Sequence, residues 1–288
     1  MSLHAKQARA DEARLEAFVD SHRRLLVITG AGCSTPSGIG AYRDEAGNWL
    51  RAEPVQMRDF VSSEGGRRRY WARSMHGWRA FRDAAPNAAH HALADLERAG
   101  AVVGLITQNV DGLHQQAGHD KVIELHGSLR WVVCLECGGR LEREEVQSWL
   151  EARNGFVLEA SARLAPDGDA DLVIDDLSAF EVPRCADCGG VLKPDVVFYG
   201  DSVPRERVDA CYAGVVEADA VLVVGSSLMV FSSFRFVRRA IDLGKPVAAL
   251  NKGQTRADAW LDFKVDGDCA AVLARVAANL LSGFRRGG

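Results

Sequence analysis

The chain has 288 residues, of which 47% are hydrophobic and 26% charged, with a formal net charge of −4. This composition is ordinary for a globular protein, and the net charge creates no global field that favours nucleic acid or an anionic membrane. No apolar run approaches the ~20 residues that span a bilayer, and the mixed-charge N-terminus has no signal-peptide stretch. We therefore expect a cytoplasmic protein that binds neither membranes nor nucleic acid directly.

Strands that alternate with helices are predicted along most of the chain. A polar helix is expected over residues 5–21, and a second helix over 88–99 follows the start signal Pro86-Asn87. Short, branched apolar runs that end at turn residues predict buried parallel strands. These runs cover 25–28, 102–107, 220–224 and 247–250. The alternation predicts an α/β fold with a Rossmann-like, doubly wound parallel sheet, in which ligands bind where strands end.

Two segments interrupt this alternation. Residues 33–90 contain no clear strand and predict loops and short helices, and residues 131–195 carry cysteine pairs and an acidic, loop-like stretch. We interpret both as insertions that form a smaller domain beside the sheet. The predicted Rossmann-like domain comprises 1–40, 90–130 and 195–280, the small zinc-containing domain 41–89 and 131–194, and the tail 281–288.

A glycine-rich turn, GAGCSTPSG at 30–38, directly follows the first predicted strand. Glycines there allow a backbone to approach a pyrophosphate, and the N–H groups of a following helix start attract the anion. The third glycine of the dehydrogenase fingerprint falls at Thr35, so a hydride-transfer site is disfavoured. A tight structural turn explains this motif about as well.

Polar and small residues also follow the other predicted strands. Gln108, Asn109 and Asp111 come after 102–107, where a sheet presents its ligands, although an Asx turn or a helix cap explains the last two equally. The turns at 225–227 and 251–253 have compositions that are common between strands and helices.

His126, in the segment ELHGS at 124–128, is the best candidate for a catalytic base. Histidine exchanges a proton near neutral pH, and the glycine after it permits close approach of a substrate. A lone histidine is more often structural, so this interpretation depends on the motifs around it.

Two Cys-x-x-Cys pairs give the strongest physical signal in the sequence. Four thiolates complete a closed tetrahedral shell around zinc, which leaves no open position and therefore predicts a structural ion. The segment between the pairs, 138–184, is longer than the ~15–20 residues of simple zinc modules, and a redox dithiol is the alternative. The predicted ligands are Cys134, Cys137, Cys185 and Cys188.

In this order, the motifs resemble those of the sirtuin family of NAD-dependent protein deacylases. The matching segments are GAGCSTPSGI at 30–39, YRD at 42–44, TQNVDGLH at 107–114, LHGS at 125–128, the two cysteine pairs, KPDVVFYGD at 193–201, GSS at 225–227 and LN at 250–251. They extend over about residues 20–270. RYWAR at 69–73, LAPDGD at 164–169 and LKPDVVFYGD resemble class II of the family, which contains the mitochondrial fourth mammalian sirtuin.

The resemblance implies that NAD is the co-substrate and that one zinc ion is structural. It places one group of residues near the phosphates, with an aromatic and an arginine closing over them: Gly30, Ala31, Gly32, Ser34, Thr35, Tyr42 and Arg43. A second group would surround the nicotinamide ribose: Gln108, Asn109 and Asp111. A third group would hold the adenosine half: Gly225, Ser226, Ser227, Asn251, Lys252, Gly253 and Cys269.

The implied chemistry assigns catalysis to His126 and Asn109. In the family the substrate amide oxygen attacks the ribose carbon as nicotinamide departs, and His126 then acts as general base on a ribose hydroxyl. Deacylated lysine and O-acyl-ADP-ribose are the products. An acylated lysine of a protein or peptide would reach His126 while its backbone adds a strand along Val197, Phe198, Tyr199 and Gly200.

The preferred acyl group stays open between two hypotheses. Tyr70-x-x-Arg73 resembles the pair that reads acidic acyl groups in the desuccinylase branch, because an arginine can hold a carboxylate bidentately. Alternatively Arg73 is an ordinary helix residue, and acetyl, lipoyl or other long acyl groups are the substrates. One departure from the family pattern is Gly40-Ala41 before Tyr42, where many members carry Pro-Asp.

Three other functions compete with deacylation. A protein ADP-ribosyltransferase would use the same NAD with a different acceptor. A zinc-ribbon nucleic-acid binder would use the four cysteines, but few basic and aromatic residues surround them. An NAD sensor would leave His126 idle.

Overall fold

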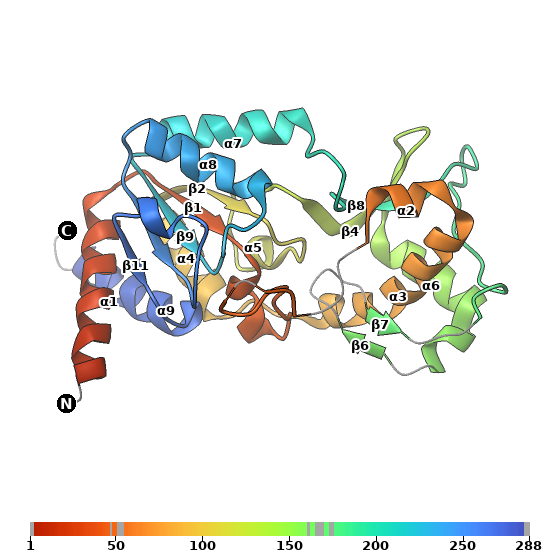
Figure 1. The fold of residues 1–288 in the computed structure, drawn as a ribbon, viewed down its shortest axis with the longest axis horizontal. Helices are drawn as coiled ribbons and strands as arrows, with labels where there is room; N and C mark the ends of the chain where they lie inside the picture. Colours follow the sequence, from red (N-terminus) through yellow and green to blue (C-terminus); the bar gives the residue numbers. More distant parts are fainter. Residues whose placement is uncertain are drawn as a thin grey trace.

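A computed structural model describes residues 3–46, 48–50, 55–159, 162–164, 170–172 and 176–284. A parallel sheet with helices on both faces occupies one end of the elongated molecule, and a smaller sheet with helices lies at the other end (Figure 1). No described helix combines the length and apolar character needed to cross a membrane.

The larger sheet has six parallel strands in the order β11-β10-β9-β1-β2-β3. The order reverses between β1 and β9, which makes the carboxyl ends of these two strands the switch point where such sheets bind ligands. The strands are β1 (Leu25–Thr29), β2 (Val102–Thr107), β3 (Val122–Glu124), β9 (Ala220–Val224), β10 (Val247–Leu250) and β11 (Phe263–Val265). The predicted doubly wound sheet is confirmed, as are the predicted strands in β1, β2, β9 and β10.

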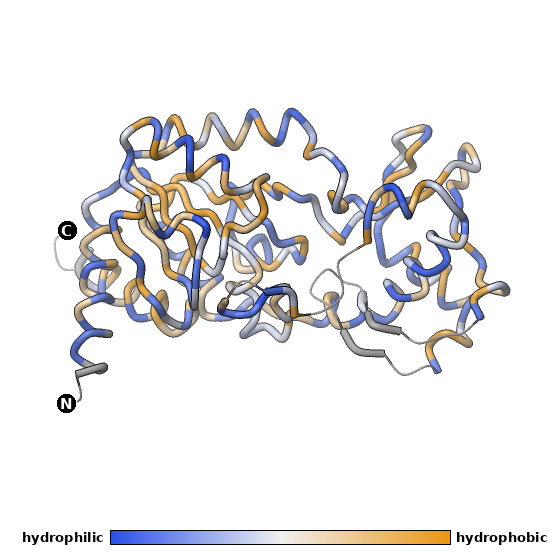
Figure 2. The backbone as a smooth tube through the Cα atoms, viewed as in Figure 1, coloured by the Kyte–Doolittle hydropathy of each residue, from blue (hydrophilic) through white to orange (hydrophobic). Residues whose placement is uncertain are grey.

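Each face of this sheet is covered by its own helices. Successive residues of a strand point to opposite faces, so Leu25 and Val27 join one apolar cluster and Leu26 and Ile28 join another. The first cluster includes helices α1 (Leu3–Ser21), α4 (Ala88–Arg98) and α9 (Cys269–Phe284), and the second includes α7 (Arg205–Glu217) and α8 (Phe231–Asp242). The strands form the hydrophobic centre of this layered structure (Figure 2). Both predicted helices, in α1 and α4, are confirmed.

The smaller sheet is antiparallel, in the order β5-β4-β8. It packs with nearby helices around a separate core that contains Phe60, Trp71 and Phe180, each at most 1% exposed. Its elements are α2 (Met57–Ser62), α3 (Glu64–Asp83), β4 (Gly127–Cys134), β5 (Arg140–Glu142), α6 (Arg143–Asn154) and β8 (Leu192–Val196), with the short hairpin β6 (Ala162–Leu164) and β7 (Ala170–Leu172). Residues 165–169 of the LAPDGD motif lie outside the described residues.

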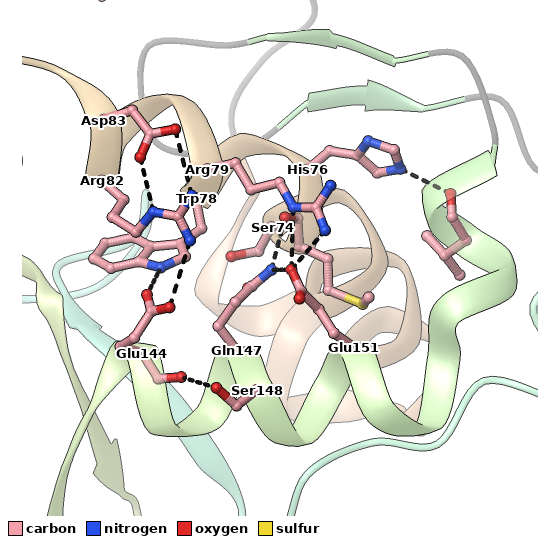
Figure 3. Close-up of polar contacts among 12 residues, drawn as sticks. Ser74, His76, Trp78, Arg79, Arg82, Asp83, Glu144, Gln147, Ser148 and Glu151 are labelled. Carbon is pink, nitrogen blue, oxygen red and sulfur yellow. Dashed lines mark hydrogen bonds and ion pairs between the residues drawn. The ribbon is translucent and has the colours of Figure 1, made fainter.

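The prediction of only loops and short helices over 33–90 is wrong, because α3 is a 20-residue helix. Glycines at 65, 66 and 77 weaken its intrinsic helix propensity, and packing against α6 compensates. Figure 3 shows the polar part of that interface, in which Trp78 Nε1 donates to Glu144 Oε2 at 2.8 Å and Arg79 pairs with Glu151 at 3.0 Å. Tertiary contacts therefore decide this helix.

Short helical segments complete the described chain. They are η1 (Ala31–Cys33), η2 (Thr35–Ser37), α5 (Leu113–Gln116), η3 (Gly155–Glu159) and η4 (Asp258–Trp260). The first two form the glycine-rich turn after β1, and α5 follows β2, so both lie at the carboxyl edge of the large sheet.

Candidate active site

Two glycine turns interlock at the switch point of the large sheet. The N–H of Gly32, after β1, donates to the carbonyl of Gly225, after β9, at 2.9 Å. A Cβ on Gly225 would lie 2.3 Å from the backbone nitrogen of Cys33, and Gly225 has a φ of +59°. Only glycine permits this approach, so the two turns form one continuous wall at the strand ends.

This wall lines a pocket of about 300 Å³, a volume at the lower end of small-molecule sites. Most residues predicted to bind NAD meet there, although they come from separate strand ends. They are Gly30, Ala31, Gly32, Thr35, Tyr42, Arg43, Gln108, Asn109, Gly225, Ser226, Ser227, Asn251, Lys252 and Cys269. Further lining residues, which were not among those predicted to bind NAD, are Ala41, Asp44, Glu45, Leu228, Met229, Val230, Gly267 and Asp268.

Ser34 and Asp111 lie behind the pocket wall. Ser34 is fully buried; its hydroxyl donates to Asp111 Oδ2 at 2.7 Å and accepts from Asn109 Nδ2 at 3.0 Å. Burial is the largest influence on the pKa of Asp111, which is raised. These two residues therefore orient Asn109, whose amide also donates to the carbonyl of Gly30 at 3.0 Å.

Gly253 also lies outside the pocket lining, against the loop that contains the lining residues 42–45. Its φ is +73°, and a Cβ there would lie 2.2 Å from the carbonyl oxygen of Glu45. The next residue, Gln254, donates its N–H to the same oxygen at 3.0 Å. Gly253 thus packs its backbone closely against the 42–46 loop at the pocket.

An aromatic cluster extends that loop toward the second sheet. The guanidinium of Arg43 lies 3.8 Å from the ring centre of Trp49, whose ring meets Tyr199 edge-on at 5.8 Å. Tyr42 contacts Trp49 in the same way at 6.4 Å. Sequence reasoning missed Trp49, and its only signal was an aromatic residue shortly after the YRD motif. Tyr199, predicted as a substrate residue, lines the same pocket.

His126 lies between β3 and β4, beside the pocket-lining Gln108. Its Nδ1 is 3.2 Å from the carbonyl oxygen of Gln108, and its Nε2 is 2.8 Å from Ser232 Oγ. Because a carbonyl only accepts, Nδ1 carries the proton and Nε2 presents a lone pair. The pKa of His126 is lowered from 6.5 to about 4, mainly by burial and to a smaller extent by Arg235 and Arg207, while the carbonyl of Gln108 acts to raise it. The imidazole is therefore neutral and able to accept a proton at neutral pH.

The backbone after His126 fixes its position. Gly127 has a φ of +85°, and a Cβ there would lie 2.0 Å from the carbonyl oxygen of Asp195 in β8. The carbonyl of His126 accepts the N–H of Val197 at 2.8 Å. The backbone of the predicted base is thus hydrogen-bonded to the segment predicted to hold the peptide substrate.

The predicted substrate residues divide between a backbone segment and a helix. In the segment, the carbonyls of Phe198 and Tyr199 already accept from Asp201 and Met57, so an added strand must use the remaining groups, and Gly200 has a φ of +78°. Tyr70 of α3 is 4% exposed and packs against Phe198 with 5.1 Å between ring centres. Arg73 follows one turn later and is partly exposed. Tyr70 therefore lies next to the predicted peptide segment.

The four predicted zinc ligands meet at one end of the small sheet. Their sulfur atoms lie within 4.8 Å of one another, with Cys134 and Cys188 at 3.5 Å and Cys137 and Cys185 at 3.7 Å. Tetrahedral thiolates at ~2.3 Å from zinc produce separations of this size. The turns that follow carry glycines at φ +74° and +72°, and the N–H of Gly139 donates to Cys137 Sγ at 3.4 Å. The donor set fits zinc and leaves no ligand position for a substrate.

A second group of metal-type residues, Cys33, His90 and His114, is buried behind the pocket. His90 Nδ1 accepts the N–H of Asn87 at 3.2 Å, so its Nε2 carries the proton and has no lone pair for an ion. His114 Nε2 lies 3.0 Å from the hydroxyl of Thr29, which itself donates to Thr107. We interpret this group as neutral histidines that support the strand ends.

The depressed pKa of His90 makes stability depend on pH. Burial is the main cause that lowers this pKa from 6.5 to about 4, so within that range the unfolded chain binds a proton that the folded chain does not. Stability is therefore lost as the pH falls below the unfolded pKa, down to the folded one. From about pH 7 to pH 5, we expect His90 to account for about 2 kcal/mol of the fall in unfolding free energy.

Urea unfolding at both pH values, for the protein and for His90→Gln, measures this contribution. Glutamine keeps a side-chain acceptor but does not titrate. The unfolding free energy of the variant should therefore fall less between pH 7 and pH 5. An equal fall in both proteins would contradict the assignment.

Comparisons with known proteins agree with this geometry. The family model described as Sir2 family matches residues 30–232. The chain belongs to the Sir2 family. It is 55% identical over 260 residues to NAD-dependent protein deacetylase 2 of Bradyrhizobium diazoefficiens, covering 90% of this chain and 95% of the relative. It is 46% identical over 276 residues to NAD-dependent protein deacylase Sirt4 of Drosophila melanogaster, covering 95% and 88%.

Solved structures of the Sir2 family share the fold along nearly the whole chain. One Sir2 structure with a deacetylated p53 peptide and 3′-O-acetyl ADP-ribose matches with a TM-score of 0.75 and 27% identity, over 93% of this chain and 97% of that chain. Another Sir2 protein, bound to a propionylated peptide, matches with a TM-score of 0.74 and 28% identity, over 93% and 97%. This Sir2-family chain thus shares its fold with proteins solved with peptide and with acetyl ADP-ribose.

Proposed function

We propose that this Sir2-family enzyme removes acyl groups from protein lysines with NAD as co-substrate, and that His126 is its general base. The observation that carries the proposal is the Nε2 lone pair of a neutral His126, whose Nδ1 contacts the carbonyl of the pocket-lining Gln108. NAD supplies the ribose hydroxyl from which this nitrogen would take a proton. The named relatives, which are NAD-dependent deacetylases and a deacylase, support the same reaction.

Different residues of the pocket would bind different parts of NAD. Lys252 and Arg43 offer positive charge to a pyrophosphate, and the glycine turn offers close backbone approach. Asn109, held by Ser34 and the carbonyl of Gly30, presents a fixed amide beside Gln108. Zinc, when bound by the four cysteines, supplies only bonds between loops of the small domain.

Product analysis tests the proposal directly. The enzyme is incubated with NAD and acetyl, lipoyl, succinyl and methylglutaryl lysine peptides, and the products are separated by mass spectrometry. O-acyl-ADP-ribose together with free lysine peptide is the expected result. ADP-ribosylated protein without deacylated peptide would instead establish the transferase alternative, and no release of nicotinamide would support an NAD sensor.

Arg73 follows one helical turn after Tyr70, which packs against Phe198 of the predicted peptide segment, and this supports a test of acidic acyl groups. Arg73→Ala is expected to lower kcat/KM for succinyl and methylglutaryl peptides by about 10–100-fold, because a charged hydrogen bond contributes about 1.5–3 kcal/mol. Neutral acyl peptides should change by less than about threefold. Arg69→Ala, on the same helix, is the control. Equal effects on both acyl classes would reject the acidic pocket.

A further inference from the structure

The first turn of helix α8 contacts both the proposed base and the pocket. Ser232 Oγ lies 2.8 Å from His126 Nε2, and the neighbouring Ser233 Oγ donates to Gln108 Oε1 at 2.8 Å. The backbone carbonyl of Gln108 closes the ring of contacts at His126 Nδ1, at 3.2 Å. The side chain of Gln108 also donates to Ser226 Oγ in the second glycine turn at 2.7 Å. One helix start therefore links the base to the pocket wall.

The direction of the Ser232 contact follows from the tautomer of His126. Since Nδ1 carries the proton that it shares with a carbonyl, Nε2 can only accept, and the Ser232 hydroxyl must donate. This donor is placed at the nitrogen that would take a proton from substrate. The Ser232 hydroxyl fixes the orientation of the imidazole ring, with the Nε2 lone pair directed toward α8. This hydrogen bond also stabilises the neutral form of the ring.

Charges around His126 also favour its neutral form. The N-terminus of α8 carries a partial positive charge that disfavours an imidazolium beside it. Two cations face the ring: Arg235 of α8, whose Nε donates to the carbonyl of Ser232 at 3.0 Å, and Arg207 of α7, which pairs with Asp195 at 3.2 Å. Both remain in place when only the hydroxyl is removed, so the effect of Ser232 is separable from theirs.

We propose that Ser232 is a positioning residue for the deacylation reaction, which holds the proton-accepting nitrogen of His126 in its productive tautomer and orientation. The hydroxyl occupies Nε2 in the resting enzyme and yields that position to the ribose hydroxyl when both substrates are bound. Ser232 acts through His126 and forms no bond to substrate. The proposal rests on the proposed role of His126 as base.

The test measures steady-state deacylation by Ser232→Ala across pH. We expect kcat to fall about 3–10-fold, because the ring keeps only one of its two anchoring hydrogen bonds. KM for NAD and for peptide should change by less than about twofold. Loss of a donor to the neutral form raises the pKa of His126, so the acid limb of the profile should move up by roughly 0.5–1 pH unit.

Two further variants separate positioning from simple structural damage. Ser232→Thr keeps the hydroxyl and should restore both kcat and the acid limb. Ser148→Ala, at an exposed serine of α6 that bonds only the carbonyl of Glu144 among the described contacts, should leave both unchanged. An unmoved acid limb with wild-type kcat in Ser232→Ala overturns the proposal, and so does a rise in KM alone. If either result is found while His126→Ala is inactive in the same assay, only the role of Ser232 is rejected. If His126→Ala is active, the assignment of His126 as base is rejected as well.

Discussion

Replacing His126 with alanine is expected to lower kcat for deacylation by about 10²–10⁴-fold, which is the usual contribution of a general base. The loss follows from removing the only neutral nitrogen lone pair that the described structure places beside Gln108 at the pocket edge. Binding of NAD should persist, because the described residues that line the pocket do not include His126. Peptide turnover is measured by mass spectrometry and NAD binding by calorimetry.

A matched control distinguishes this effect from general damage to the chain. His22 directly follows α1 on the outer helix layer, contacts the carbonyl of Phe18 at 2.7 Å and is not among the residues that line the pocket. His22→Ala should leave kcat within about twofold of the original. Near-normal turnover by His126→Ala would remove the base assignment, whereas loss of NAD binding would show that the pocket itself had changed.

Local signals predicted the large sheet and the pocket wall well. The run at 25–28 is apolar throughout because both faces of β1 are covered, and Gly225 is required where two backbones touch. Such features depend on a few consecutive residues and can therefore be predicted from the sequence. The four cysteines were predicted equally well, because their spacing and the glycines that follow them indicate a metal site without knowledge of the fold.

Other features depend on contacts between distant segments and left no local signal. Helix α3 carries several glycines and arginines, and its length is decided by packing on α6. Ser34 belongs to a motif that suggested phosphate contact, yet the fold buries it against Asp111, 77 residues along the chain. Ser232 meets His126 across 106 residues of the chain, a contact that no local pattern indicates. Sequence patterns therefore identified which residues gather at the site more readily than which one faces the ligand.

Removing zinc is expected to unfold the small domain and abolish deacylation. The cysteines join the turn between β4 and β5 to the turn before β8, so the ion closes the long segment 138–184 onto the sheet that positions His126. Structural zinc contributes about 10–16 kcal/mol of apparent binding free energy in small zinc domains, which matches or exceeds the about 5–15 kcal/mol net stability of a typical protein. Chelation, or Cys185→Ala, should therefore lower the melting temperature and turnover together.

The same geometry predicts that the ion takes no part in the reaction. Four sulfur ligands fill a tetrahedral shell, so no position remains for water or a carbonyl oxygen. Replacing zinc with Co²⁺ should keep kcat within about twofold, because both ions accept the same four thiolates. Leu135→Ala, at an exposed residue between the first two cysteines, is the control and should retain one equivalent of metal. A metal-dependent change in the acid limb, or full activity after chelation with an unchanged melting temperature, would contradict a purely structural ion. The first outcome would show that the ion acts directly in the reaction, and the second that neither folding nor activity needs it.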